Sequence, residues 1–385
     1  MNFEFATATR IIFGPGTLPQ AGPIAKDFGS RALVVTGRNP DRAERLLSEL
    51  RVRGVTPITF SVSGEPELTT ITDGVALAKK EKCDLVISIG GGSVLDAGKA
   101  IAAMLTNDAD LLEYLEVIGA GKPLTRSPAP LIAIPTTAGT GSEVTRNAVL
   151  ASPQHKVKVS VRSLHMLPKV ALVDPELTYD LPPAITASTG LDALTQLIEA
   201  YLCSRSNPMT DTVCADGIWH AARSLRLACR PGRHPEARED MALAGLFGGM
   251  ALANAGLGAA HGFAGPLGGM FSAPHGQLCA ALLPHVLAAN FRALRERDSK
   301  NPILLRFHVV AQWLTGNQEA FSAEQGIDWV RKLVSDLKIP PLRTYGISLA
   351  DKERIVANAA KASSMKANPI VLTQNELGGI LEQAL

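Results

Sequence analysis

Two histidines, His261 and His275, lie in a stretch of the chain that carries no acidic or basic side chain besides them. The stretch spans residues 257–277 and reads LGAAHGFAGPLGGMFSAPHGQ, with glycines and prolines around both histidines. A histidine in an apolar segment must satisfy two ring nitrogens, through hydrogen bonds or through a metal ion. The pair therefore has two interpretations. Either one histidine is buried against a backbone partner and the other is an incidental surface residue, or both are functional.

A carboxylate and a side-chain amide upstream could complete a metal site with these histidines. Asp192 and Gln196 are four residues apart in a predicted helix, 188–202, so they share one face, and Glu199 shares it more loosely. Carboxylate, amide oxygen and imidazole nitrogen are all ligands of divalent cations. Asp192 alone could instead complement the positive end of the helix dipole.

A glycine-rich turn, 90–100, reads GGGSVLDAGKA and lies between an apolar strand and a helix. Its glycines let the backbone approach a ligand closely, and the free N–H groups of the new helix can hold a phosphate. The spacing is not G-x-G-x-x-G, and the turn follows the third strand rather than the first. A tight strand-to-helix turn without a ligand is therefore an alternative.

A second polar loop, 135–145, reads PTTAGTGSEVT and also follows an apolar strand directly. Its hydroxyl groups could donate to a pyrophosphate or to a nicotinamide amide, although an ordinary loop that caps a helix is an alternative. Ligands of open α/β sheets bind at the carboxyl ends of the strands. Two such loops after neighbouring strands favour a ligand site.

The elements that carry these loops alternate regularly. Continuous apolar strands are predicted at 31–37, 57–62, 83–92 and 128–136, separated by helices at 40–54, 68–82 and 93–105. This alternation indicates a parallel sheet covered on both faces. Before it, residues 3–13 alternate in polarity and predict a strand or hairpin outside the main sheet.

The second half of the chain has a different pattern. After short β-like pieces at 156–161 and 169–175, the segment 178–186 contains Pro-Pro and predicts an interdomain hinge. Helices are then predicted at 186–203, 208–229, 236–255, 275–292, 303–315, 321–336 and 347–361. The predicted fold is a Rossmann-like α/β domain, residues 1–182, followed by an all-α domain, residues 183–385. The cleft between two such domains is the expected ligand site.

Composition excludes several classes of protein. Apolar residues make up 46% and charged residues 19% of 385 residues, which indicates a substantial core, and a net charge of +2 without basic clusters argues against a nucleic-acid surface. The five cysteines include no CxxC pair, which fits reduced thiols better than a disulfide framework. The N-terminus lacks a signal-peptide pattern, and no apolar run reaches about 18 residues. We therefore expect a soluble, cytoplasmic protein without membrane or nucleic-acid partners.

Several of these motifs, in this order, resemble the iron-containing (group III) alcohol dehydrogenases. The matching stretches are GGGSVLDAGKA, IPTTAGTGSEVT, TGLDALTQLIEA and HGFAGPLGGMFSAPHG followed by LLPHV, and the resemblance extends from FGPG at 13–16 to ANPIVLT at 367–373. It implies an NAD(P)-dependent oxidoreductase with the two predicted domains, a dinucleotide at the two loops and a divalent metal, iron or zinc, in the cleft.

Carried over position by position, the resemblance gives an incomplete metal set. Asp192, His261 and His275 match ligands of the family, whereas Gln196 stands where the family usually has histidine. The family also commonly has a second histidine where this chain has Gly265. Because an amide oxygen binds iron or zinc more weakly than imidazole, a metal-loaded and a metal-free site both remain open.

In either case the resemblance implies that the two histidines are catalytic. Without metal, His261 and His275 as N–H donors, or Lys158 or Lys366, would have to polarise the substrate carbonyl.

The resemblance also implies the cofactor site. In this family the residue after the first strand of the α/β domain contacts the adenosine ribose, and an acid there favours NAD. Here the chain reads Gly37-Arg38-Asn39, and an arginine without an acid can accept a 2′-phosphate, which favours NADP, although Arg38 could also be a solvated surface charge. The predicted cofactor residues are Gly37, Arg38, Gly90, Gly91, Gly92, Ser93, Asp96, Thr136, Thr137, Thr140, Ser142, Thr145 and Lys158.

The leading hypothesis is a cytoplasmic NAD(P)-dependent alcohol dehydrogenase or aldehyde reductase that acts on a small molecule and forms a homodimer through its N-terminal strand. Three alternatives stay open. They are a maleylacetate-reductase-like enzyme of an acidic carbonyl substrate, a lyase resembling dehydroquinate synthase, and a nucleotide-binding protein without turnover.

Overall fold

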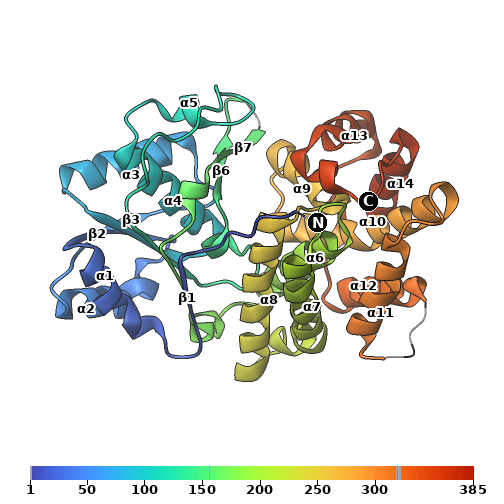
Figure 1. Cartoon of the computed structure of the whole chain (residues 1–385), viewed down its shortest axis with the longest axis horizontal. Coiled ribbons are helices and arrows are strands. Elements are labelled where there is room, and N and C mark those ends of the chain that lie inside the picture. The colour runs from blue at the N-terminus through green and yellow to red at the C-terminus, as the bar shows by residue number, and fades with distance from the viewer. Residues whose placement is uncertain (1, 156, 318, 320–321) are drawn as a thin grey trace. The chain divides into compact units, whose positions relative to one another are not determined.

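The computed structural model describes every residue except 1, 156, 318, 320 and 321. The first residues of the predicted strand 156–161 and of the predicted helix 321–336 lie outside the described residues. Contacts within the chain divide it into two compact units, Ala6–Asp180 and Leu181–Leu385, and residues 2–5 group with the second. Figure 1 shows strands and helices in the first unit and helices in the second.

The first unit is built on a six-stranded sheet of order β1-β8-β5-β4-β2-β3, in which all neighbours are parallel. This confirms the predicted parallel α/β sheet. Its strands are β1 (Arg10–Phe13), β2 (Arg31–Thr36), β3 (Thr56–Ser61), β4 (Leu85–Gly90), β5 (Leu131–Pro135) and β8 (Val170–Val173). A separate antiparallel pair consists of β6 (Asn147–Ser152) and β7 (Val157–Arg162).

Helices cover both faces of this sheet because its strands are apolar on both sides. Leu33 and Val35 of β2 belong to the cluster that includes α3 (Leu68–Lys80) and α4 (Gly92–Thr106). Val34 of the same strand packs instead with α1 (Ala21–Phe28) and α2 (Glu44–Val52). Figure 1 shows these two helix pairs on opposite faces of the strands. The short helix α5 (Leu111–Tyr114) completes the unit.

The second unit consists of helices, as predicted. The helix α6 (Pro183–Leu202) is buried along almost its whole length, so neighbouring helices surround it. The other helices are α7 (Pro208–Ala228), α8 (Pro235–Asn254), α9 (Ala259–Met270), α10 (His275–Arg297), α11 (Ile303–Thr315), α12 (Ala323–Asp336), α13 (Lys352–Lys361) and α14 (Gln374–Ala384).

Several features differ from the sequence prediction, among them the helix α14 and the strand β6, which were not predicted. The prediction that the N-terminal strand stands outside the main sheet is wrong, because β1 is the edge strand of that sheet and pairs with β8 from Arg10 to Phe13. The helix α9 was not predicted, since five residues of its sequence AAHGFAGPLGGM are glycine or proline. The helix predicted at 347–361 begins only at Lys352.

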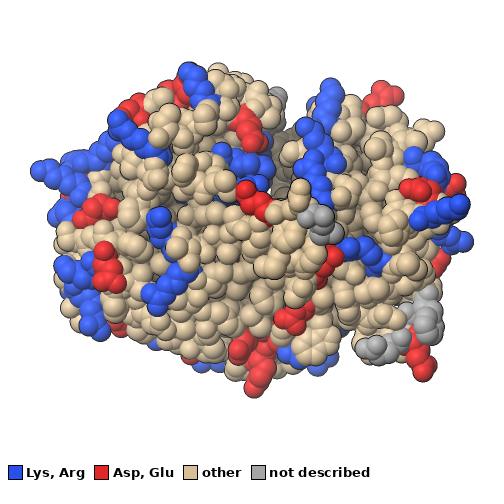
Figure 2. All heavy atoms as spheres, viewed as in Figure 1, with Lys and Arg blue, Asp and Glu red and all other residues tan. Residues whose placement is uncertain are grey.

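The surface and the helix lengths agree with the composition. Figure 2 shows Lys and Arg side chains interspersed with Asp and Glu on the visible face, with no extended region of one sign. Among the described residues, no single helix is long and apolar enough to cross a membrane. The consecutive helices Pro235–Asn254 and Ala259–Met270, bent by 95°, pass that test of length and composition only as a pair.

Candidate active site

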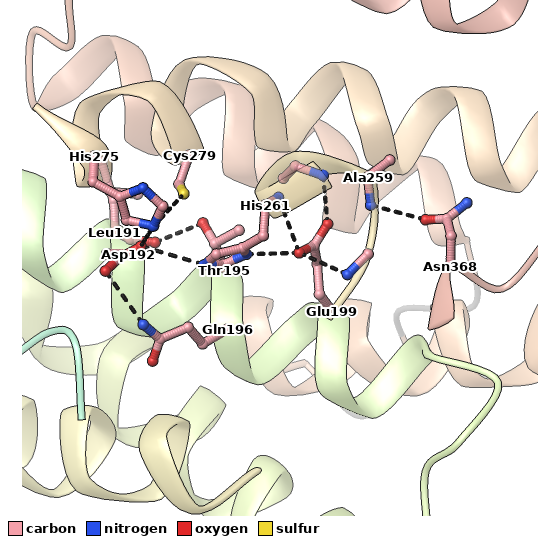
Figure 3. Close-up of polar contacts among 12 residues, drawn as sticks. Leu191, Asp192, Thr195, Gln196, Glu199, Ala259, His261, His275, Cys279 and Asn368 are labelled. Atoms are coloured by element: carbon pink, nitrogen blue, oxygen red, sulfur yellow. Dashed lines mark hydrogen bonds and ion pairs between the residues drawn. The ribbon is translucent and has the colours of Figure 1, made fainter. Parts of the chain in front are cut away.

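Four side chains of the helical unit bring their potential ligand atoms within 4.8 Å of one another: Asp192, His261, His275 and Cys279. Figure 3 shows that they come from three helices, α6, α9 and α10, and point toward one another. The aspartate, His261 and the cysteine are buried, whereas the His275 side chain is 37% exposed. The structure therefore gathers the two predicted histidines and the predicted aspartate, and adds a cysteine that the sequence analysis did not consider.

Local packing explains how α10 reaches α6. His275 is the first residue of α10, and Cys279 lies four residues later on the same face. Between them, Gly276 lies so close to the backbone of Ser188 in α6 that a Cβ would overlap it. The glycine thus lets the first turn of α10 pack directly on α6, beside Asp192.

Glu199, about two turns beyond Asp192 along the same face of α6, holds the start of α9. Its carboxylate accepts hydrogen bonds from the backbone N–H groups of Gly258 at 3.0 Å, Ala260 at 2.6 Å and His261 at 3.4 Å. These are donors that a helix N-terminus leaves without intrahelical partners, and a negative charge there also complements the helix dipole. Gly258 has no side chain to cap the helix, and a Cβ at this position would lie 2.8 Å from Glu199 Oε1 and displace the carboxylate.

Asn368 satisfies the remaining donor of this turn. Its side-chain oxygen accepts from the backbone N–H of Ala259 at 3.0 Å. The amide itself is fixed by reciprocal hydrogen bonds with Asn290 of α10, at 2.7 and 3.1 Å. The start of α9 is therefore anchored by buried polar groups from two distant parts of the chain.

Glu199 also decides which nitrogen of His261 faces the cluster. Its Oε2 lies 2.7 Å from Nδ1 of His261, so Nδ1 carries the proton that the carboxylate accepts. The other nitrogen, Nε2, lies 3.5 Å from Oδ1 of Asp192, and neither of these buried atoms has a hydrogen-bond partner. A neutral imidazole would place two lone pairs opposite each other here. A cation fits between them, either a proton or a metal ion.

The electrostatics agree with that requirement. Burial disfavours the charged form of His261, but its close approach to Cys279 and to the carboxylates of Asp192 and Glu199 outweighs burial, and the pKa of His261 lies well above its usual value. Burial works against the charge of Asp192 as well, yet His275 and His261 hold the pKa of that carboxyl below its usual value. The arrangement therefore favours anionic Asp192 next to positive charge.

The two positions that depart from the family pattern have physical surroundings of their own. Gln196 donates through Nε2 to Oδ2 of Asp192 at 3.2 Å, and Figure 3 shows its Oε1 pointing away from the imidazoles. Gly265 lies inside α9 directly before Pro266, and a Cβ added to it meets no atom outside its neighbours in the chain. Because a proline ring crowds the Cβ of a preceding helical residue, glycine suits this position.

In the α/β unit, both predicted cofactor loops lie at the carboxyl edge of the sheet, next to each other. Gly90 pairs with Pro135 in the register of β4 and β5, and its carbonyl accepts from the N–H of Thr136 at 2.9 Å. A Cβ on Gly92 would lie 2.7 Å from a methyl carbon of Thr140. The N-cap of α4 is Gly91, which offers no side-chain cap to the first N–H groups of the helix. Such free N–H groups form a site for a phosphate.

Three predicted cofactor residues lie instead in a buried network around Lys99, which the sequence analysis missed. Lys99 is 1% exposed and donates to Thr145 Oγ1 at 2.9 Å and to the carbonyl of Ser142 at 3.0 Å. It also forms an ion pair with Asp96 at 3.1 Å, and Asp96 accepts from the Ser142 hydroxyl at 2.5 Å. These contacts hold the polar loop 135–145 against α4. In the sequence, the network is indicated only by a lysine on the apolar face of a helix.

The remaining predicted residues of this unit are near the same edge or paired elsewhere. Gly37 follows β2, and Arg38 next to it is exposed. The strand order turns back between β2 and β4, and this switch point is where open α/β sheets bind ligands. Lys158 forms an ion pair with Glu65 at 3.1 Å. Lys366, the other lysine considered, is exposed in the helical unit.

Comparison with known proteins gives matches to both units. Residues 8–175 match the family described as iron-containing alcohol dehydrogenase, and residues 186–385 match the C-terminal domain of the Fe-containing alcohol dehydrogenase family. The chain belongs to the iron-containing alcohol dehydrogenase family. It is 36% identical to 1,3-propanediol dehydrogenase of Klebsiella pneumoniae, over 99% of this chain and 98% of that protein.

A second relative and a solved structure show the same full-length similarity. The NAD-dependent methanol dehydrogenase of Bacillus methanolicus is 33% identical over all of both chains. The crystal structure of a 1,3-propanediol oxidoreductase superposes with a TM-score of 0.93 at 36% identity and covers 100% of each chain.

Membership confirms the predicted enzyme class. This iron-containing alcohol dehydrogenase interconverts alcohols and aldehydes or ketones, and its family uses NAD(P) and a metal. The matches do not favour the maleylacetate-reductase, lyase or non-catalytic alternatives.

Proposed function

We propose that this enzyme oxidises and re-forms a short primary alcohol with a nicotinamide cofactor bound at the carboxyl edge of the sheet and a divalent metal bound by Asp192, His261 and His275. The observation that carries the metal assignment is the pair of buried atoms, Asp192 Oδ1 and His261 Nε2, that face each other without hydrogen-bond partners. Gln196, predicted as a further ligand, contributes through Asp192 in this proposal.

When bound, the nicotinamide exchanges a hydride with the alcohol carbon, and the metal stabilises negative charge on the substrate oxygen. The protein's part is to hold and orient. Glu199 keeps the proton of His261 on Nδ1, so that Nε2 presents its lone pair to the cluster. His275 is the partly exposed member, and we propose that the alcohol approaches the cluster on its side.

For the cofactor, we propose that Gly90, Gly91, Gly92 and Ser93 bind the pyrophosphate through backbone N–H groups, with the partly exposed Thr136, Thr137 and Thr140 beside them. The buried Lys99 network of Asp96, Ser142 and Thr145 supports this loop rather than contacting the ligand. In this proposal, Gly37 lies under the adenosine ribose, and Lys158 lies near the nicotinamide end of the cofactor.

The substrate class rests on the relatives. One is named for 1,3-propanediol and the other for methanol, and both are short primary alcohols. Pairing of two copies along β1 is our proposal for a homodimer, because this edge strand has one neighbour, β8, among the described residues. All five cysteines are free, which suits a reducing compartment such as the cytoplasm.

Arg38 tests the cofactor assignment. We expect NADPH to support faster aldehyde reduction than NADH. Arg38→Ala should lower kcat/KM for NADPH about 10-fold or more, because a charge-assisted bond to the 2′-phosphate contributes roughly 1.5–3 kcal/mol. The kcat/KM for NADH should stay within about 2-fold of the wild-type value. Arg42→Ala, an exposed arginine four residues later, is the matched control. Equal losses with both cofactors would contradict the role of Arg38. Failure of both cofactors to reduce any short aldehyde, with zinc or iron supplied, would contradict the proposed function.

A further inference from the structure

We infer that Cys279 is a metal ligand of this enzyme, so that the site is an Asp-His-His-Cys set in which the thiolate takes the fourth position and Gln196 does not bind the metal. The inference rests on the proposed function only in placing a divalent metal among Asp192, His261 and His275.

Three of the six distances among the four candidate ligand atoms match the edges of a tetrahedron around zinc, and all six are within 4.8 Å. Bond lengths of about 2.0–2.1 Å to nitrogen or oxygen and about 2.3 Å to sulfur require edges of roughly 3.3 Å between nitrogen and oxygen and roughly 3.6 Å between nitrogen and sulfur. The observed edges are 3.5 Å from His261 Nε2 to Asp192 Oδ1, 3.7 Å from His275 Nε2 to the same oxygen, and 3.6 Å from His275 Nε2 to Cys279 Sγ. The side chains are already spaced for such an ion.

Burial and unpartnered atoms support a shared ligand. Cys279 is fully buried and Asp192 is 2% exposed, so the sulfur and the carboxylate meet away from bulk water. Asp192 Oδ1 and His261 Nε2 have no hydrogen-bond partner, although both are polar atoms directed into the same space. One cation at the centre would satisfy all of them at once.

Gln196 is placed to orient the aspartate. Its Nε2 donates to Asp192 Oδ2 at 3.2 Å, which leaves Oδ1 toward the histidines. Rotating the amide by a half-turn would set its oxygen against the carboxylate, two acceptors facing each other, so the donor orientation is the favoured one. Gln196 is therefore a positioning residue, and its oxygen points away from the cluster (Figure 3).

A thiolate ligand changes the metal preference. Sulfur is a soft donor that favours zinc over iron, and the same preference follows from the general order of divalent affinities. Binding requires the thiolate, so the thiol of Cys279 releases its proton to solvent as the sulfur–metal bond forms. We therefore expect the purified enzyme to prefer zinc over iron when both are offered.

Cobalt(II) substitution gives a readout that does not depend on activity. The full-length protein, stripped of metal by a chelator, is titrated with Co²⁺ while the near-ultraviolet thiolate-to-cobalt charge-transfer band is recorded. We expect the band in the wild type and in Cys214→Ser, whose cysteine is equally buried but lies in α7. Cys279→Ser should lack the band and bind Co²⁺ more than about 100-fold more weakly. Gln196→Leu should keep the band and bind about 10–100-fold more weakly, as for loss of a group that orients a ligand.

Three results would overturn the inference. Stoichiometric Co²⁺ binding without the band in the wild type excludes Cys279 as a ligand and leaves the rest of the metal site in place. Loss of all Co²⁺ binding in Gln196→Leu, with binding intact in Cys279→Ser, assigns the fourth position to Gln196. Absence of Co²⁺ binding in the wild type removes the metal site altogether, and cofactor-dependent aldehyde reduction by the same preparation then shows whether the proposed function survives without it. The wild-type spectrum decides the question even if a variant fails to fold.

Discussion

Glu199→Gln is the substitution whose effect the structure defines most closely. The carboxylate accepts four N–H groups: those of Gly258, Ala260 and the backbone and side chain of His261. A glutamine keeps the shape but has one oxygen. In its better orientation that oxygen keeps the three donors now on Oε2, and the new amide NH₂ is set against the N–H of Ala260.

The cost can be estimated from these contacts. One buried donor left without an acceptor costs about 1–3 kcal/mol, and each remaining bond loses the strength that the negative charge gave it. Together these losses should lower the free energy of unfolding by about 3 kcal/mol. For a unit of this size, 1 kcal/mol corresponds to roughly 2–4 °C of unfolding temperature. The expected fall is therefore about 6–12 °C.

Thermal unfolding of the full-length protein measures this fall, with Glu296→Gln as the matched control because Glu296 is an exposed glutamate of α10. We expect the control to unfold within about 1 °C of the wild type, since surface substitutions rarely exceed 0.5 kcal/mol. A fall in Glu199→Gln no larger than in the control would refute the view that this carboxylate anchors α9 and its histidine.

Two further predictions concern the α/β unit. Lys99→Met should lower the free energy of unfolding by about 3 kcal/mol, because it leaves Asp96 without its buried cation. The control Lys79→Met, on the exposed side of α3, should leave it unchanged. Equal unfolding temperatures of the two variants would contradict the stabilising role of Lys99. Burial raises the pKa of Glu143 from 4.5 to about 7, so the native state keeps a proton that the unfolded chain loses between these values. Stability should therefore fall by roughly 3 kcal/mol as pH rises through this window and stay at the lower level above it. Glu143→Gln should remove this pH dependence. In urea unfolding, the variant should match the stability of the wild type near pH 4.5 and exceed it near pH 8. If stability falls with pH as steeply in the variant as in the wild type, Glu143 is not the source of the pH dependence.

Much of the fold could be predicted because its signals are local. Strands such as β2 and β4 are short apolar runs, and helices such as α7 and α11 carry their own periodicity and terminal residues, so pattern alone finds them. The signal fails where glycine and proline interrupt a helix. The helix α9 forms because Glu199 and Asn368 bind its first N–H groups, and these residues are distant in sequence.

The sequence by itself determined the parallel α/β sheet, the helical second half, the two loops at the strand ends and the family. It also predicted Asp192, His261 and His275 as residues of one site, and the structure brings their side chains together. These conclusions depend on spacing along one strand, one turn or one helix face, which the sequence carries directly.

Only the tertiary structure decided which side chains meet. The four-residue spacing of His275 and Cys279 is visible in the sequence, but their approach to Asp192 depends on Gly276 packing against the backbone of α6. In the same way, Glu199 reaches His261 across 62 residues of chain. Contacts of this kind depend on how helices pack, and no local pattern records them. For this reason the approach of Cys279 to the cluster and the contact of Glu199 with His261 emerged only from the folded chain.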